Sequence, residues 1–217
     1  MIFLKNSLNA KQLKDMFLYV AQRIVDNEEY LTVIDKRIGD GDHGTGMSLG
    51  FREVIKELNL KEFTNMNDVF HCVGMTLLDT MGGASGVLFG TVFISGIVGL
   101  EPMEEIDIEG ISRIFEKSLD ALKRRGKAKV GDKTMVDAFE PAVNALLHSS
   151  EKGLTLREGF DNAEAKAREG VEYTKQCVAR FGRAKSYGDA SIGFEDAGAV
   201  SVWIIFRSMA EWIRTLQ

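Results

Sequence analysis

The residues with the clearest potential for chemistry lie in the stretch DKRIGDGDHGTG, residues 35–46. Three aspartates, Asp35, Asp40 and Asp42, lie among four glycines there, and no hydrophobic period runs through the stretch. Carboxylates held this close raise one another's pKa unless a cation lies between them. The stretch therefore predicts a hard divalent metal ion bound by aspartate oxygens, with glycines that let a ligand approach the backbone. Phosphates are the usual ligands of such a site.

The number of carboxylates sharpens this prediction. Three that meet at one point exceed what a single magnesium ion usually takes from protein, so we expect a pair of ions bridged by a polyphosphate. His43 follows directly and is a candidate for touching a phosphate or orienting a ligand. A lone histidine is more often structural, and only its neighbours favour a functional role here.

Other interpretations of the same stretch are weaker. Gly39, Gly41 and Gly44 match the dinucleotide fingerprint G-x-G-x-x-G, but two aspartates at the intervening positions would repel a pyrophosphate. An EF-hand that started at Asp40 would have Phe51 where its final glutamate is needed. An acidic turn without any ligand stays open, because Asp-Gly steps make good turns.

Composition limits the class of protein. The chain of 217 residues is long enough for one domain with a full core, and we expect a single domain over residues 1–217. Its net charge of -5 argues against a nucleic-acid partner. The two cysteines, Cys72 and Cys177, are too few and too far apart for a disulfide framework or a zinc site, so a reducing cytoplasm fits best. The most apolar stretch, residues 87–100, is too short to span a membrane.

Hydrophobic spacing predicts an all-α protein with no confident sheet. In the first segment, Leu13, Phe17, Val20 and Ile24 fall on one helical stripe. Residues 30–34 and 91–98 are β-branched enough for strands but lack a pairing partner. Eight helices are expected, over residues 8–27, 45–58, 67–81, 86–99, 107–125, 133–149, 155–180 and 197–216. Their expected N-caps include Asn67, Asp107, Asp132 and Asp196.

Three further glycine-rich segments separate these helices. Residues 81–86 (MGGASG) allow close backbone approach before a helix N-terminus that favours an anion, although a plain interhelical turn is as good an explanation. Residues 124–135 form a basic loop that resembles a P-loop without its strand, and a solvated turn explains it equally well. Residues 180–199 form the longest stretch without helical period, with Arg183 as a candidate phosphate clamp. Asp196 is expected either to cap the last helix or to contact a ligand.

Taken together, these four segments resemble the L subunit, the nucleotide-binding domain, of dihydroxyacetone kinases. The matching text is IDKRIGDGDHG, MTLLDTMGGASGVLFGT, RGKAKVGDKTM and GRAKSYGDASIGFEDAGA, in this order and over nearly the whole chain. The resemblance implies an eight-helix antiparallel barrel with a nucleotide site at one end.

The resemblance also implies roles for individual residues. Asp35, Asp40 and Asp42 would hold two magnesium ions between the phosphates of ADP or ATP. Arg183 would join them as a catalytic residue. Apart from the resemblance, Lys133 in the basic loop is a less certain source of further positive charge. The remaining nucleotide contacts would be His43, Gly44, Thr45, Gly46, Ala84, Ser85, Gly126, Met135, Asp196, Ala197 and Gly198. The chain departs from the family at Ala197, within the usual Asp-Pro-Gly, and at Gly46, where a polar residue is common.

The function implied is phosphoryl transfer as one subunit of a kinase. In this family a separate K-type subunit holds dihydroxyacetone as a covalent adduct on a histidine. In phosphotransferase-type systems an M-type protein rephosphorylates the retained nucleotide, whereas other members turn over ATP. A related ketose or ketoacid kinase and a non-catalytic nucleotide-binding regulator are the alternatives, and homodimerisation stays open.

Overall fold

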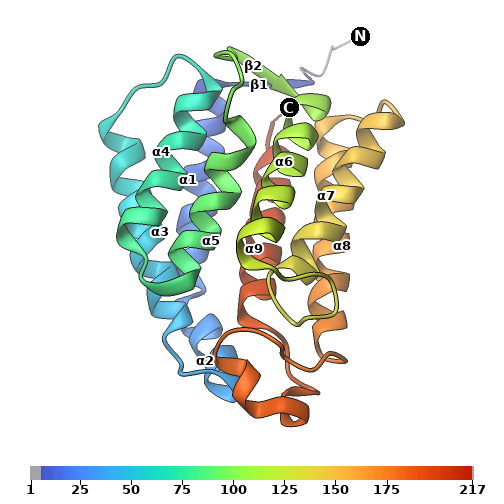
Figure 1. The fold of residues 1–217 in the computed structure, drawn as a ribbon. Coiled ribbons are helices and arrows are strands. Elements are labelled where there is room, and N and C mark those ends of the chain that lie inside the picture. The colour runs from blue at the N-terminus through green and yellow to red at the C-terminus, as the bar shows by residue number, and fades with distance from the viewer. Residues whose placement is uncertain (1–5, 217) are drawn as a thin grey trace.

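The computed structural model describes residues 6–216, which form a helical protein with one very small sheet (Figure 1). Within that range the chain has nine α-helices and two 3-10 helices. The α-helices are α1 (Ala10–Asp26), α2 (Glu28–Ile38), α3 (His43–Leu60), α4 (Met66–Thr80), α5 (Gly83–Ile94), α6 (Ile108–Gly126), α7 (Val136–Glu151), α8 (Leu156–Thr174) and α9 (Ala197–Ile213). The 3-10 helices are η1 (Ser95–Ile97) and η2 (Arg183–Ser191), and the strands are β1 (Ser7–Asn9) and β2 (Glu105–Asp107).

Eight of these helices form a closed ring. In the order α1, α3, α4, α5, α6, α7, α8 and α9, each helix packs on the next, and α9 packs back on α1. Figure 1 shows that neighbouring helices run in opposite directions around the ring. The prediction of an all-α, eight-helix antiparallel barrel is therefore confirmed. The predicted domain, residues 1–217, also includes residues 1–5 and 217, which lie outside the described part of the chain.

Helix α2 and the small sheet were not predicted from the sequence. Helix α2 takes up the YLTVI segment and lies across one end of the ring, against α3, α9 and η2 (Figure 1). Strand β1 pairs antiparallel with β2, with Leu8 opposite Ile106. Neither segment considered as a strand became one, since residues 91–98 fall largely in α5 and η1.

Two of the four predicted N-caps are correct. The side chains of Asp107 and Asp196 accept hydrogen bonds from the first turns of α6 and α9. Helix α4 is capped by Asn65 instead of Asn67, because its first turn begins two residues earlier than its hydrophobic period indicates. Helix α7 begins at Val136 instead of near Asp132, whose carboxylate accepts from the backbone N–H of Lys129 in the preceding loop.

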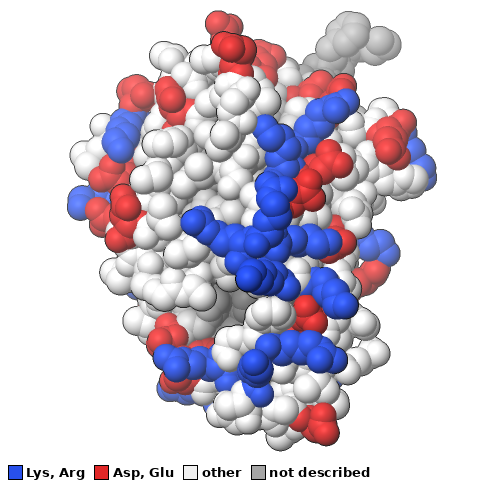
Figure 2. Space-filling view, in the orientation of Figure 1, with Lys and Arg blue, Asp and Glu red and all other residues white. Residues whose placement is uncertain are grey.

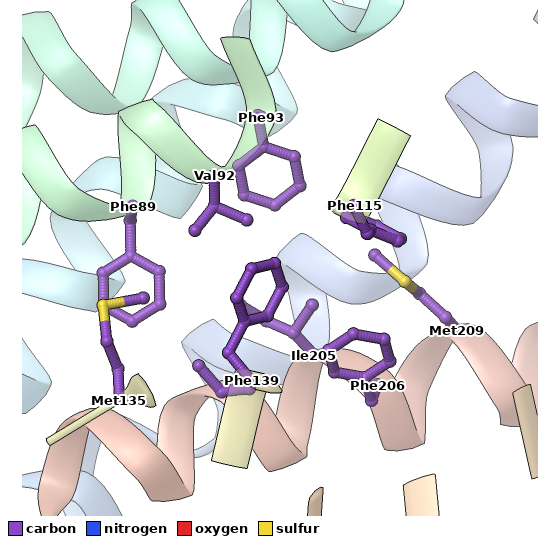
Figure 3. Close-up of a pocket in the computed structure, with 10 residues that line it drawn as sticks. Phe89, Val92, Phe93, Phe115, Met135, Phe139, Ile205, Phe206 and Met209 are labelled. Atoms are coloured by element: carbon purple, nitrogen blue, oxygen red, sulfur yellow. The ribbon is translucent and has the colours of Figure 1, made fainter. Parts of the chain in front are cut away.

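The core of the described residues is rich in phenylalanine. The predicted apolar stripe of α1 is buried, and Phe17 packs edge-on against Phe70 with ring centroids 5.2 Å apart. A cavity of about 10 Å³ lies inside the ring between α5, α6, α7 and α9. This is room for about one water molecule. Figure 3 shows the side chains that line it. Phe89 and Met135 line this cavity, and they also lie beside His43 and Gly198, respectively.

All four glycine-rich segments lie at the same end of the ring. In Figure 1 this is the lower end, where the α2–α3, α4–α5, α6–α7 and α8–α9 connections meet, while the small sheet closes the opposite end. An antiparallel ring of eight helices places alternate connections at the same end, so segments distant in sequence become neighbours. Within residues 6–216, no helix is long and apolar enough to cross a membrane.

Candidate nucleotide and metal site

The three aspartates meet at the junction of α2 and α3. Asp35 lies in the last turn of α2, and its Oδ2 accepts from the backbone N–H of Gly41 at 2.8 Å and of His43 at 3.3 Å. These bonds fold the connection so that Asp40 and Asp42 return towards Asp35. Each of the three carboxylates offers an oxygen within 4.8 Å of the others. The structure thus brings together the three residues predicted to bind metal.

The pKa values of Asp40 and Asp42 are shifted in opposite directions. Burial opposes ionisation of Asp40, but a hydrogen bond from Asp42 and the charge of Arg183 outweigh it and hold the pKa of Asp40 below its usual value. Burial, the same hydrogen bond and the charge of Asp40 raise the pKa of Asp42. The Nε of Arg183 lies 2.8 Å from Asp40 Oδ2. The single positive charge of Arg183 cannot neutralise all three carboxylates of the cluster.

The donor set fits magnesium. All three groups are carboxylates, which are the hard oxygen ligands that this ion prefers. Asp40 and Asp42 are exposed, so a metal ion bound to them would keep open positions for phosphate oxygens and water. A second ion fits the same observation, since three carboxylates exceed the usual protein share of one magnesium ion.

His43 joins three helices at the edge of the cluster. Its Nε2 lies 2.8 Å from Ser201 Oγ on α9, and its ring centroid lies 6.4 Å from that of Phe89 on α5. The Ser201 hydroxyl also lies 3.0 Å from the carbonyl oxygen of Ala197, so when it donates to that carbonyl, His43 Nε2 is the donor to Ser201 and Nδ1 is left as an acceptor. Burial lowers the pKa of His43, so the ring is neutral at pH 7.

The residues after His43 form the first turn of α3. Gly44 is buried against α2, and a Cβ there would lie 2.2 Å from the carbonyl oxygen of Glu28, so this position needs a glycine. Thr45 is exposed. A Cβ at Gly46 would meet no atom within 4 Å, so the family's usual polar side chain would fit there. The departure at Gly46 therefore changes a possible ligand contact without changing the fold.

Ala84 and Ser85 lie in the first turn of α5. The N-cap is Gly82, and no side chain of the described residues caps this helix, so its first N–H groups are free to meet an anion. A Cβ at Gly86 would lie 2.1 Å from the carbonyl oxygen of Met81, so the turn from α4 into α5 requires glycine at that position. The backbone N–H groups at the start of α5 are therefore not covered by side chains at the place where the phosphates are predicted to bind.

The third and fourth segments meet through Met135 and Gly198. A Cβ at Gly198 would lie 3.4 Å from Met135 Cβ, and Met135 shares the core cavity with Phe89. Gly126 ends α6 beside α5, where a Cβ would lie 3.4 Å from Leu88 Cδ2. The third segment thus contacts the fourth and also approaches α5, the helix that follows the second segment.

Asp196 and Ala197 lie at the start of α9. Asp196 Oδ2 accepts from the N–H of Ala199 at 2.7 Å, so of its two predicted roles the structure shows the helix cap. Ala197 is buried, and its carbonyl receives the Ser201 hydroxyl that orients His43.

Lys133 does not lie where the phosphates are expected. It is 1% exposed, and its ammonium donates to the carbonyls of Thr174 and Phe194. Burial lowers its pKa, while the charge of Asp196 opposes that shift. A buried ammonium that donates to two backbone carbonyls is not presented to a ligand in solvent.

Two residues at this end of the ring, Asp137 and Ser201, were not predicted from the sequence to have a role in the site. Asp137 is fully buried and accepts from the N–H groups of Gly131 and Thr134, which fixes the α6–α7 loop. Ser201 orients His43. The sequence signals for these two residues were an acidic residue in the first turn of α7 and a serine among the apolar residues of α9.

Comparison with known proteins identifies the family. The model of the DAK2 domain matches residues 37–211, which is more than half of the chain. The chain belongs to the DAK2 domain family. The resemblance inferred from the four glycine-rich segments is thereby confirmed.

Several relatives of this DAK2 domain carry descriptive names. A protein of Listeria innocua, "PEP-dependent dihydroxyacetone kinase 1, ADP-binding subunit DhaL", is 39% identical over 88% of this chain and 90% of the relative. The ADP-binding subunit DhaL of the PEP-dependent dihydroxyacetone kinase of Escherichia coli is 36% identical over 94% of this chain and 97% of its own. The crystal structure of the dihydroxyacetone kinase from C. freundii with AMP-PNP and Mg²⁺ is 25% identical, with a TM-score of 0.72. It matches 92% of this chain but only 33% of that longer protein.

Positive charge gathers on this DAK2 domain beside the site, although the whole chain is acidic. Figure 2 shows lysines and arginines along α6 and around its C-terminal end. The last turn of α6 contains Lys123, Arg124 and Arg125, and the exposed Lys127 and Lys129 follow in the loop. We call residues 123–129 the basic rim.

The buried carboxylate of Asp196 predicts a pH-dependent stability of the DAK2 domain. Burial raises its pKa from 3.8 to about 7, against the opposing effect of the Ala199 N–H. The folded state therefore keeps a proton that the unfolded state releases, and this contribution to stability is lost as pH rises from about 4 through about 7. Asp196→Asn, which keeps a capping oxygen, should be increasingly more stable than the unmodified protein over that interval, by up to a few kcal/mol.

Urea unfolding of the nucleotide-free protein between pH 4.5 and 8.5 measures this difference. Asp107→Asn is the matched control, because Asp107 also caps a helix through its side chain but is exposed. A difference between Asp196→Asn and the unmodified protein that stayed constant with pH would contradict the assignment.

Proposed function

We propose that this chain is the ADP- or ATP-binding phosphoryl-transfer subunit of a dihydroxyacetone kinase. The acceptor would be dihydroxyacetone held by a separate K-type subunit, and the whole chain would act as one cytoplasmic nucleotide-binding domain. The observation that carries the proposal is the convergence of Asp35, Asp40 and Asp42 with three other glycine-rich segments at one end of the ring. The relatives named as kinase subunits support the enzyme class.

The residues present suggest how the chain would act. Asp35, Asp40 and Asp42 would hold two magnesium ions, which supply positive charge to the β- and γ-phosphates in a loose transition state. Arg183 extends into solvent beside Asp40 and would neutralise further charge on the transferred group. The free N–H groups at the start of α5 would position the phosphates. Nothing in this scheme requires a general base from this chain, because the partner brings the acceptor.

The partner would dock at the same end of the ring. Arg183 is 80% exposed, so a second protein can reach the cluster that it faces. The basic rim adjoins this end and would attract an acidic surface or a phosphorylated protein. Relatives named as PEP-dependent or PTS-dependent kinases favour an M-type phosphotransferase protein as a further partner, with the nucleotide as a retained cofactor.

A related ketose kinase is the second candidate. The L-erythrulose 1-kinase of Mycolicibacterium smegmatis is 34% identical over 88% of this chain, which corresponds to 33% of that protein. Because the site on this chain would bind the nucleotide, the other subunit would select the acceptor. Testing dihydroxyacetone and erythrulose with the same partner would separate the two candidates.

Native mass spectrometry combined with a transfer assay tests the proposal. We expect the purified protein to carry ADP and two magnesium ions, and the same spectrum would report any homodimer. With its K-type partner and a phosphoryl donor it should phosphorylate dihydroxyacetone. Nucleotide binding and partner association without any transfer would instead support a regulator, and no nucleotide binding at all would overturn the proposal.

A further inference from the structure

Lys133 is an unusual residue for the place it occupies. It is one of the largest fully buried side chains of the described structure, and its backbone has φ 59°, a left-handed conformation that lysine seldom adopts. Both the burial of an ammonium and the left-handed backbone cost free energy. A methionine of similar length would avoid the first of these costs. The contacts that the ammonium makes should therefore explain its presence.

Those contacts join the two ends of one long connection. The ammonium donates to the carbonyl of Thr174 at 2.6 Å and to that of Phe194. Thr174 is the last residue of α8, and Phe194 lies just before Asp196, the N-cap of α9. A single buried cation thus closes the base of the connection formed by residues 175–196, which we call the η2 loop.

The η2 loop carries Arg183. The side chain of Arg183 is 80% exposed, so its own packing does little to fix it above Asp40. Its position depends on the backbone of the loop, and the base of that loop is where Lys133 acts. Further bonds there are those from the N–H of Gly193 to the Lys175 carbonyl and from the N–H of Arg180 to the Asp132 carbonyl.

We propose that Lys133 is a positioning residue: its ammonium ties both ends of the η2 loop to the α6–α7 loop and thereby holds Arg183 over the aspartate cluster. This inference rests on the proposed function for the role of Arg183 but not for the closure of the loop. Lys133 then acts through Arg183 and touches neither nucleotide nor metal.

Hydrogen exchange on the nucleotide-free protein tests the closure directly. Lys133→Met should raise exchange by about tenfold or more at the amides of Arg180, Ile192 and Gly193, and leave the core amides of α6 unchanged. Lys133→Gln, which keeps a donor without the charge, should restore part of the protection, and it carries the test if the methionine variant does not fold. Lys129→Met removes an exposed lysine from the same loop and should leave this exchange unchanged. Unchanged protection of the η2 loop in both Lys133 variants would overturn the proposal.

A double-mutant cycle tests the link to Arg183. Lys133→Met should lower phosphoryl transfer by about tenfold, but by less than about twofold when Arg183 is already alanine. Equal losses in both backgrounds would show that Lys133 does not act through Arg183. If the unmodified protein transferred no phosphate, the proposed function would fail, and the exchange measurement would still decide the closure.

Discussion

Asp40→Asn is expected to lower phosphoryl transfer by at least about a thousandfold and to abolish magnesium-dependent nucleotide retention. Asparagine keeps the size of the side chain but removes one negative charge from a cluster whose oxygens lie within 4.8 Å of one another. A magnesium ion held by fewer carboxylates binds the nucleotide phosphates less tightly. The measurements are transfer with the K-type partner and titration of Mg·ADP by calorimetry.

The same variant should leave the ligand-free fold intact. Asp40 is exposed, and its ion pair with Arg183 is a surface pair, which contributes about 1 kcal/mol or less. The thermal midpoint without ligand should therefore change little, whereas the rise in that midpoint on adding Mg·ADP should disappear. This combination separates a lost ligand site from a damaged fold.

Two further variants test whether the loss in Asp40→Asn is due to metal binding. Asp42→Asn should reproduce the loss although the ion pair to Arg183 is formed by Asp40, which distinguishes metal binding from that pair. Asp120→Asn removes an exposed aspartate from the middle of α6 and should have no effect. Transfer by Asp40→Asn at the unmodified rate would refute the metal assignment.

The sequence predicted the ring because its signals are local. Apolar residues at helical spacing and capping aspartates such as Asp107 and Asp196 are properties of a few neighbouring residues, and they locate eight helices. Helix α2 was missed because its β-branched YLTVI segment outweighed the acidic first turn and basic last turn that mark it as a helix. The strand β1 was missed because three residues pair with a segment almost a hundred positions away.

The candidate site was predictable in composition but not in all of its roles. The clustered aspartates indicated a metal, and the structure brings their oxygens together. Lys133 was expected near the phosphates because it belongs to a basic loop that resembles a P-loop. Its actual partners are carbonyls about 40 and 60 residues later in the chain, and no local pattern indicates such contacts. Long-range contacts of this kind decide which polar residue faces the ligand and which supports the loop.

Arg183→Ala is expected to lower phosphoryl transfer by about a hundredfold while changing the affinity for Mg·ADP much less. In the structure its guanidinium faces Asp40 from an exposed position, so it is poised to meet charge that develops on the transferred phosphoryl group. A group that acts mainly on that developing charge lowers kcat more than it weakens binding. Arg183→Lys should recover only part of the rate, because an ammonium lacks the paired donors of a guanidinium.

Arg180→Ala is the matched control for this prediction. Arg180 lies in the same η2 loop and is also largely exposed, but its Nε faces Asp132 at 3.5 Å, away from the aspartate cluster. Its loss should leave transfer within about threefold of the unmodified protein, since its guanidinium is 69% exposed, and solvent weakens its pair with the buried carboxylate of Asp132. Equal losses in Arg180→Ala and Arg183→Ala would mean that the two arginines act through the general charge of the loop. Loss confined to Arg183→Ala would instead require a guanidinium at that one position, within reach of Asp40 and of a phosphate held beside it.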